Sequence, residues 1–286
     1  MNFEKNNTKD LNKQSTINNL MTYGKAKGIV LLQKYLPKLN PFVRISVIKD
    51  LEEWEKVKDN YPERITQRTD TKIGDPRIVR ITGTTGKKED IPDCIRQIKD
   101  QNPDGVLLLL TMKKETIPRY QNDGAFNIAF FQGDSVVIEL LGKGFDGGQL
   151  TREKAVHERY TIPWNEVLFM RDKYDLQKSR EVSKFVVNDE EYQRTRNERV
   201  AWLKSIEKDK EAIEEAVPPK YQPTDNDTIK SILDDIVFPL YKRQSDLKRD
   251  GLSIFNVQGN IVDGKVEPWE FFRPERLIAK NKEQER

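Results

Sequence analysis

The sequence contains few of the residues from which disulfides, zinc clusters and histidine-based catalytic sites are built. Its 286 residues include one cysteine, Cys94, and one histidine, His157. A single cysteine forms no intrachain disulfide, and one cysteine with one histidine cannot supply the four ligands of a structural zinc site. A Ser-His-Asp arrangement would have to use His157. The single cysteine favours a reducing compartment, so we expect a cytoplasmic protein.

Long hydrophobic runs are also missing. The first fourteen residues, Met1–Gln14, are polar, rich in Asn and Lys, and contain no apolar signal region. No later segment reaches the apolar length that a membrane-spanning helix needs. We therefore expect a soluble protein with no membrane partner and a flexible N-terminus over residues 1–17.

An excess of charge of one sign is nearly absent, because 50 Lys and Arg stand against 47 Asp and Glu, a formal net charge of +3. This balance gives no global attraction to nucleic acid, although local basic patches stay open. Charged residues make up 34% of the chain, which predicts a solvated surface of mixed charge around a lean core. Twelve Phe, nine Tyr and four Trp supply that core with bulky side chains, which argues against disorder.

Alternating and continuous apolar segments predict an α/β (α+β) fold with a mixed, largely antiparallel sheet and flanking helices. The predicted strands are Phe42–Ile48, Arg64–Asp70, Arg77–Thr82, Val106–Leu110, Phe126–Phe131, Ser135–Leu141 and Glu158–Ile162. The predicted helices run from Ser15 or Asn18 to Tyr35, over Asp50–Lys58 and over Asp90–Gln101. These elements form a predicted nucleotide-binding part over residues 18–164.

The character of the chain changes after Trp164. Asn165–Ala216 is long, charged and predicted to be helical, and Asp225–Arg249 is a second helical stretch that Pro239 should kink. These two stretches form a predicted charged helical part over residues 165–250. The last part, 251–286, is predicted to hold a β-hairpin that turns near Gly259-Asn260, followed by a polar tail.

A glycine-rich loop, Gly142–Gly148 (GKGFDGG), follows the predicted strand that ends at Leu141. Gly142, Gly144 and Gly147 would let backbone N–H groups approach a phosphate. A Rossmann dinucleotide site is disfavoured, because the residues after the loop are polar and give a poor face for a packed helix. Two interpretations stay open, a structural glycine turn and a phosphate or substrate loop of another kind.

Cationic side chains in other segments are candidate phosphate contacts. Lys87 ends the segment Thr82–Lys87 (TGTTGK), which is either a basic surface turn or a phosphate loop that lacks the following hydroxyl residue. Arg68, Arg80 and Arg119 lie in or near predicted strands, where they are either ordinary outward-facing residues or bidentate phosphate ligands.

Candidate metal ligands and an acid/base group lie around the glycine loop. Glu139 interrupts an apolar strand, and if it faces inward it needs a partner such as magnesium or an arginine. Asp146 in the loop and Asn127, opposite on the paired strand, are the further candidate ligands for Mg²⁺. His157 is either a structural histidine or an acid/base or phosphate contact.

The order of these segments resembles the ATP-binding domain of phosphoenolpyruvate synthase and pyruvate phosphate dikinase, members of the ATP-grasp superfamily. The similar segments, over roughly residues 20–165, are Gly24–Ala26, Asn40–Val43, Val79–Thr84, Glu89–Asp93 and Ile138–Gly144. The resemblance implies that Lys25, Arg80 and Arg119 contact the phosphates of ATP and that Glu139 holds magnesium.

Two functions therefore stay open. The first is an ATP-grasp-like protein that binds ATP and Mg²⁺ and acts as a ligase or phosphotransferase. The second is a non-enzymatic interaction protein of a phage or mobile element, which binds a protein or nucleic-acid partner through its charged helices. The Asn- and Lys-rich start is typical of an AT-rich genome, which suits the second function.

Overall fold

The computed structural model describes residues 19–75, 77, 79, 85–112, 123–130, 135–143, 156–168, 183–186, 189–205, 223–252 and 254–272. They form helices and two antiparallel sheets, so the predicted α+β class is confirmed. The described chain divides into two compact units, one with residues 19–34 and 41–112, the other with 35–40 and 123–272. The boundary expected at Trp164 falls inside the second unit.

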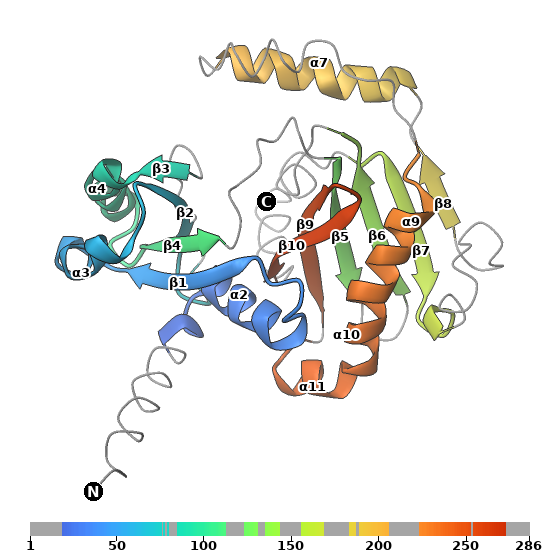
Figure 1. Cartoon of the computed structure of the whole chain (residues 1–286), viewed down its shortest axis with the longest axis horizontal. Helices are drawn as coiled ribbons and strands as arrows, with labels where there is room; N and C mark the ends of the chain where they lie inside the picture. Colours follow the sequence, from blue (N-terminus) through green and yellow to red (C-terminus); the bar gives the residue numbers. More distant parts are fainter. Residues whose placement is uncertain are drawn as a thin grey trace, which may run out of the picture. The chain divides into compact units, whose positions relative to one another are not determined.

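The described part of the first unit contains a four-stranded antiparallel sheet and helices (Figure 1). In spatial order its strands are β1 (Phe42–Ile48), β4 (Val106–Met112), β2 (Arg64–Asp70) and β3 (Thr85–Lys87). Its helices are α2 (Gly24–Tyr35), α3 (Leu51–Val57) and α4 (Ile91–Gln101), with short 3₁₀ turns η1 (Lys58–Asn60) and η2 (Lys88–Asp90). Every strand predicted from Phe42 to Leu110 except one, and both helices from Asp50 to Gln101, are confirmed.

Strand β4 holds this unit together, because side chains on both of its faces are buried. Leu107 and Leu109 pack with residues of α3 and α4, including Trp54. Val106 and Leu108 point the other way and pack with Leu20, Tyr23 and Ala26, at and before the start of α2. The near-continuous apolar run in the sequence therefore marks a central strand that is covered on both faces, as predicted.

The second unit is built on a six-stranded antiparallel sheet. In spatial order its strands are β10 (Lys265–Phe272), β9 (Phe255–Val262), β5 (Gly124–Phe130), β6 (Ser135–Leu141), β7 (Glu158–Pro163) and β8 (Ser183–Val186). Its helices are α7 (Asp189–Ser205), α9 (Asn226–Ile232), the π-helix η4 (Leu233–Val237), α10 (Phe238–Lys242) and α11 (Gln244–Arg249). The hairpin predicted between Phe126 and Leu141 is the β5–β6 pair.

The two faces of this sheet differ in chemistry. One face is apolar and packs against α9, η4 and α10, which lie over the strands in Figure 1. Its aromatic rings are stacked, with the Phe130 and Phe255 centroids 4.7 Å apart. Trp164 lies beside Phe130 and joins this stack to Tyr241 of α10, with the Trp164 and Tyr241 centroids 4.8 Å apart. The opposite face carries the polar side chains that form the candidate site.

One strand prediction and part of one helix prediction are wrong. Arg77 and Val79, the residues of Arg77–Thr82 that the structure describes, are not in a strand, and β3 lies further on. Gly86 of β3 packs so closely on Gln67 that an added Cβ would lie 2.6 Å from the Gln67 amide nitrogen. The glycines predicted to form a loop thus include one that lies in a strand, under the Gln67 side chain.

The second error is β8, Ser183–Val186, which lies inside the region predicted to be helical and joins the sheet beside β7. A strand of four residues shows too little of the two-residue alternation to be recognised within a long charged sequence. The helix predicted to start at Ser15 or Asn18 also differs, because α2 begins at Gly24 after a turn in which Tyr23 bridges Lys72. Both predicted caps lie outside the described residues.

The C-terminal hairpin is confirmed, but its turn is misplaced in the prediction. The turn is Asp263-Gly264, whose φ angles of 51° and 68° are those of a two-residue hairpin turn. Gly259 lies in mid-strand, where an added Cβ would meet Glu267 O at 2.3 Å. Pro239, which cannot donate a backbone hydrogen bond, lies just after the π-helical turn η4, and the helical backbone continues through it to Lys242.

Candidate functional site

A row of hydrogen-bonded polar side chains crosses four neighbouring strands on the polar face of the six-stranded sheet. Asn256 Nδ2 on β9 donates to Asn127 Oδ1 on β5 at 3.0 Å, and Asn127 Nδ2 donates to Glu139 Oε2 on β6 at 2.9 Å. Arg159 on β7 donates to Glu139 Oε1 through Nη2 at 2.7 Å and through Nε at 3.1 Å. Strand register explains the row, since Asn127 is paired with Glu139 and Glu139 with Arg159.

Glu139 is therefore a partly buried carboxylate on the polar face of the sheet, with an arginine partner. Its side chain is 18% exposed, whereas that of Arg159 is 49% exposed. The sequence left open whether magnesium or an arginine would accompany Glu139, and the structure shows Arg159 as one partner of this carboxylate. Both donors of Arg159 reach Oε1, and Oε2 accepts a hydrogen bond from the Asn127 amide.

Asn127 and Glu139 carry side-chain oxygens of the kind that magnesium takes in proteins. The oxygen and nitrogen of a side-chain amide are assigned from its hydrogen bonds. If the amides of Asn127 and Asn256 both rotate by about 180°, Asn127 Nδ2 becomes the donor and Asn256 Oδ1 the acceptor of the hydrogen bond between them. The rotation would place Asn127 Oδ1 beside Glu139 Oε2, where the two atoms now in contact are 2.9 Å apart. Adjacent ligand oxygens of octahedral magnesium, with bonds of about 2.0–2.1 Å, are about 2.9 Å apart.

A second group of polar contacts lies where the chain leaves β6. Gly142 N–H donates to His157 Nδ1 at 2.9 Å, and His157 N–H donates to Leu140 O at 2.9 Å. His157 is 2% exposed, and burial, followed by the nearby Arg196 cation, lowers the pKa of its imidazole to about 4. The imidazole is therefore neutral at pH 7 and accepts a hydrogen bond through Nδ1. These contacts favour a structural role for His157. The neutral imidazole cannot act as a general acid at neutral pH, because it carries no imidazolium proton.

Arg196 of α7 belongs to this second group, and no sequence pattern predicted its contact with the end of β6. The Arg196 side chain is buried and donates from Nη1 to the main-chain oxygen of Lys143 at 2.8 Å. Arg196 is 53 residues from Lys143 in the sequence. Arg196 lies in a helix of mixed charge, where nothing in the sequence separates it from the neighbouring arginines.

Lys25 and Arg68, the candidate phosphate contacts of the first unit, lie near an occupied helix N-terminus. Asp70 Oδ2 accepts hydrogen bonds from Lys25 N at 2.7 Å and Ala26 N at 2.9 Å, so the first turn of α2 already holds an anion. The Lys25 ammonium donates to Thr69 O at 2.6 Å. Arg68 is half-buried on β2, opposite Leu108 of β4, on the face of the sheet against which Ala26 packs.

Lys87 is exposed at the end of β3. Its ammonium pairs with Glu89 at 3.0 Å, and this hydrogen bond raises the pKa of Lys87. The contact agrees with the basic surface turn that the sequence left open. Nothing in the contacts of Lys87 points to a phosphate.

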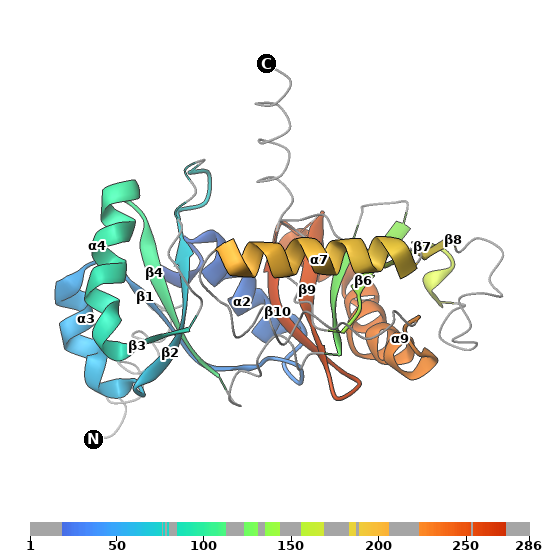
Figure 2. The same cartoon turned by 90° about the horizontal axis from the view of Figure 1, so that it is seen from above.

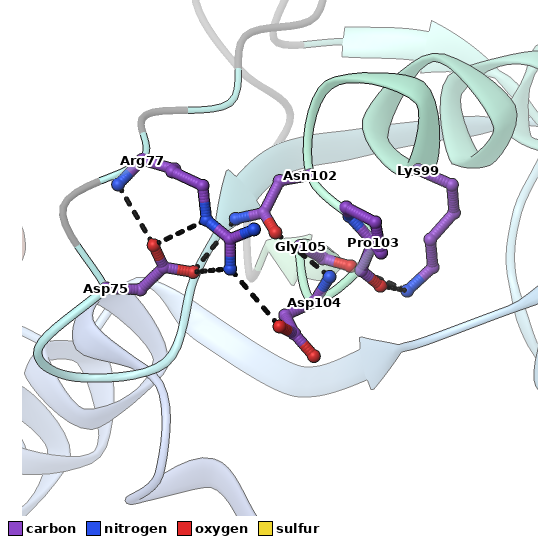
Figure 3. A network of polar contacts seen from close by, with 7 residues as sticks. All are labelled: Asp75, Arg77, Lys99, Asn102, Pro103, Asp104 and Gly105. Atoms are coloured by element: carbon purple, nitrogen blue, oxygen red, sulfur yellow. Dashed lines mark hydrogen bonds and ion pairs between the residues drawn. The ribbon is translucent and has the colours of Figure 1, made fainter.

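The chain just before Arg80 is fixed by the network of Figure 3. Asp75 Oδ1 accepts from Arg77 Nε at 2.9 Å, and Asp75 Oδ2 accepts from Asn102 Nδ2 at 2.9 Å. These hydrogen bonds, that from Arg77 first, lower the pKa of the Asp75 carboxyl. Arg77 also reaches Asp104 at 3.2 Å, so the network joins two turns of the first unit.

Five predicted site residues lie outside the described residues: Arg80, Arg119, Gly144, Asp146 and Gly147. Of the others, the structure brings Asn127 and Glu139 into contact, and joins Gly142 to His157. Arg159, Arg196 and Asn256 join these groups without having been predicted.

Within the described ranges, no three or more His, Cys, Asp or Glu side chains gather as a metal site. The same residues include no helix with the length and apolarity to cross a membrane. No family model and no curated protein matches the chain.

Proposed function

We propose that the chain binds a magnesium–nucleotide complex, with ATP as the ligand that the ATP-grasp resemblance suggests. The observation that carries the proposal is the contact between Asn127 and Glu139, which brings an amide and a carboxylate, the oxygen ligands that magnesium takes in proteins, side by side at 2.9 Å. The two side chains project from the two central strands of the sheet, β5 and β6, on its polar face.

The surroundings of Glu139 suit a cation that is shared with phosphate. Arg159 already holds Oε1 and so fixes the carboxylate, while Oε2 would accept the metal. The half-exposed Arg159 side chain can also turn toward a phosphate oxygen, since a guanidinium is a bidentate phosphate ligand. Bound magnesium would neutralise phosphate charge, and these residues would orient the nucleotide.

Thermal unfolding with Mg-ATP tests this function. At a free ligand concentration 100 times its Kd, binding raises the free energy of unfolding by about 2.7 kcal/mol. Glu139→Gln retains the shape of the side chain and removes its charge, so we expect most of the Mg-ATP-induced increase to be lost. The matched control is Glu198→Gln, because Glu198 is 65% exposed on α7.

Three outcomes would contradict the proposal. These are no stabilisation of the wild type at millimolar Mg-ATP, equal stabilisation of the Glu139→Gln variant, and equal stabilisation when EDTA replaces magnesium. The first would favour the alternative proposal, a non-enzymatic protein that binds a macromolecular partner through its charged helices. The second would place any nucleotide elsewhere on the chain.

A further inference from the structure

Two consecutive residues after β6 are held by side chains from distant parts of the sequence. His157 accepts a hydrogen bond from Gly142 N–H, and Arg196 donates one to Lys143 O. Gly142 and Lys143 come directly after Leu141, the last residue of β6, and are three and four residues beyond Glu139. The main chain is thus fixed on both its donor and its acceptor side at this point.

The burial of Arg196 is specific to its position on α7. Arg196 is 3% exposed, whereas the side chain of Arg194, two residues earlier on the same helix, is 65% exposed and pairs with Glu198 at 3.2 Å. Removing a guanidinium from water costs several kcal/mol unless its donors are used. An arginine on a helix surface is normally exposed to solvent. The burial of Arg196 therefore indicates a specific contact, its hydrogen bond to Lys143 O.

Helix α7 lies across one end of the six-stranded sheet in both views (Figures 1 and 2). Arg196 therefore reaches the end of the strand that carries Glu139. His157 lies beside Arg196, whose charge helps to lower the pKa of the imidazole. Glu158, which is also buried, acts in the opposite direction on that pKa.

We propose that Arg196 is a positioning residue of the nucleotide site, which fixes the main chain at Gly142 and Lys143 so that it meets the phosphates next to Glu139. This inference rests on the proposed function, and it adds α7 to the site. Arg196 acts through Lys143 O and not on the nucleotide. The hydrogen bond from Arg196 to Lys143 O would raise the affinity for the nucleotide by ordering the main chain before the ligand binds, because a pre-ordered site loses less entropy on binding.

The test compares Arg196→Met with the control Arg194→Met in the full chain. Selective ¹⁵N-glycine labelling reports exchange of the Gly142 amide, ¹³C-histidine labelling reports the pKa of His157, and calorimetry gives the Kd for Mg-ATP. For Arg196→Met we expect faster Gly142 exchange, a higher His157 pKa and a Kd raised roughly 10- to 100-fold, the range for a lost hydrogen bond to a charged group. Arg194→Met should match the wild type in all three.

The outcomes separate this inference from the proposed function. If the wild type binds Mg-ATP and the Kd of Arg196→Met is unchanged, the positioning role is overturned while the proposed function stands. Unchanged Gly142 exchange and His157 pKa overturn it as well. A wild type that binds no Mg-ATP overturns both proposals. If Arg196→Met does not fold, Arg196→Lys replaces it, and a Kd equal to that of the wild type with faster Gly142 exchange overturns the inference.

Discussion

Acid should destabilise the second unit through His157. The pKa of the imidazole is about 6.5 in an unfolded chain and about 4 in the fold, because burial and the Arg196 cation oppose its protonation. Between these two values the unfolded chain binds a proton that the folded chain does not. The free energy of unfolding contributed by His157 is therefore complete above pH 6.5, falls as the pH drops, and levels off below pH 4.

The magnitude follows from the two pKa values. At about 1.4 kcal/mol per pKa unit, the full difference corresponds to about 3 kcal/mol. At pH 5 the imidazole is nearly all protonated in the unfolded chain and mostly neutral in the fold, so about 2 kcal/mol should already be lost relative to pH 7.5.

The assay is urea unfolding of the wild type and His157→Asn at pH 7.5 and pH 5. Asparagine cannot titrate, and its side-chain oxygen can take the place of Nδ1 as acceptor for Gly142 N–H. A Trp54→Phe background restricts the fluorescence change to the second unit, where the other three tryptophans lie. Carboxylates titrate in both proteins, so the difference between them isolates His157. Parallel losses of stability in the two proteins would refute the burial argument.

Two further substitutions test the packing. Gly259→Ala should destabilise the chain by several kcal/mol, on the order of a severe core overpacking, because its Cβ would lie 2.3 Å from Glu267 O. Gly264→Ala has no atom within 4 Å of its Cβ and a φ of 68°, so it should cost only about 1–2 kcal/mol; equal costs in urea unfolding would contradict the close approach at Gly259. Asn102→Ala removes a buried donor from Asp75 and should cost about 1–3 kcal/mol by the same measurement, and a neutral effect would show that the network of Figure 3 does not stabilise the first unit.

The parts of the fold with a local signal were predictable from the sequence. β5 is buried along its whole length and β6 alternates between buried and partly buried residues up to Leu140, and their pairing places Asn127 opposite Glu139 as expected. Asp263-Gly264 could have fixed the C-terminal turn, because this dipeptide has a strong preference for a two-residue hairpin. Gly259 competed with it as a turn signal, and only the approach of the neighbouring strand shows that this glycine serves packing.

The partners of the candidate site depend on contacts that no local pattern specifies. Arg159 faces Glu139 only because β7 pairs with β6 in one register, and a shift of one residue would turn Arg159 to the other face. Arg196 is one of several cations in a mixed-charge helix, and its burial follows from where α7 lies against Lys143. Sequence reasoning therefore found the carboxylate and the amide but neither arginine.

The proposed metal site at Glu139 and Asn127 is tested most directly in crystals grown with ATP and Mn²⁺, a magnesium substitute whose position an anomalous signal reveals. We expect an anomalous peak from a metal ion bound by Glu139 Oε2 and Asn127 Oδ1, with the Asn127 amide rotated and a nucleotide phosphate oxygen also bound to the metal. Bound nucleotide with its metal elsewhere, or a Glu139 carboxylate that remains bonded to Asn127 Nδ2 beside bound Mn-ATP, would contradict it.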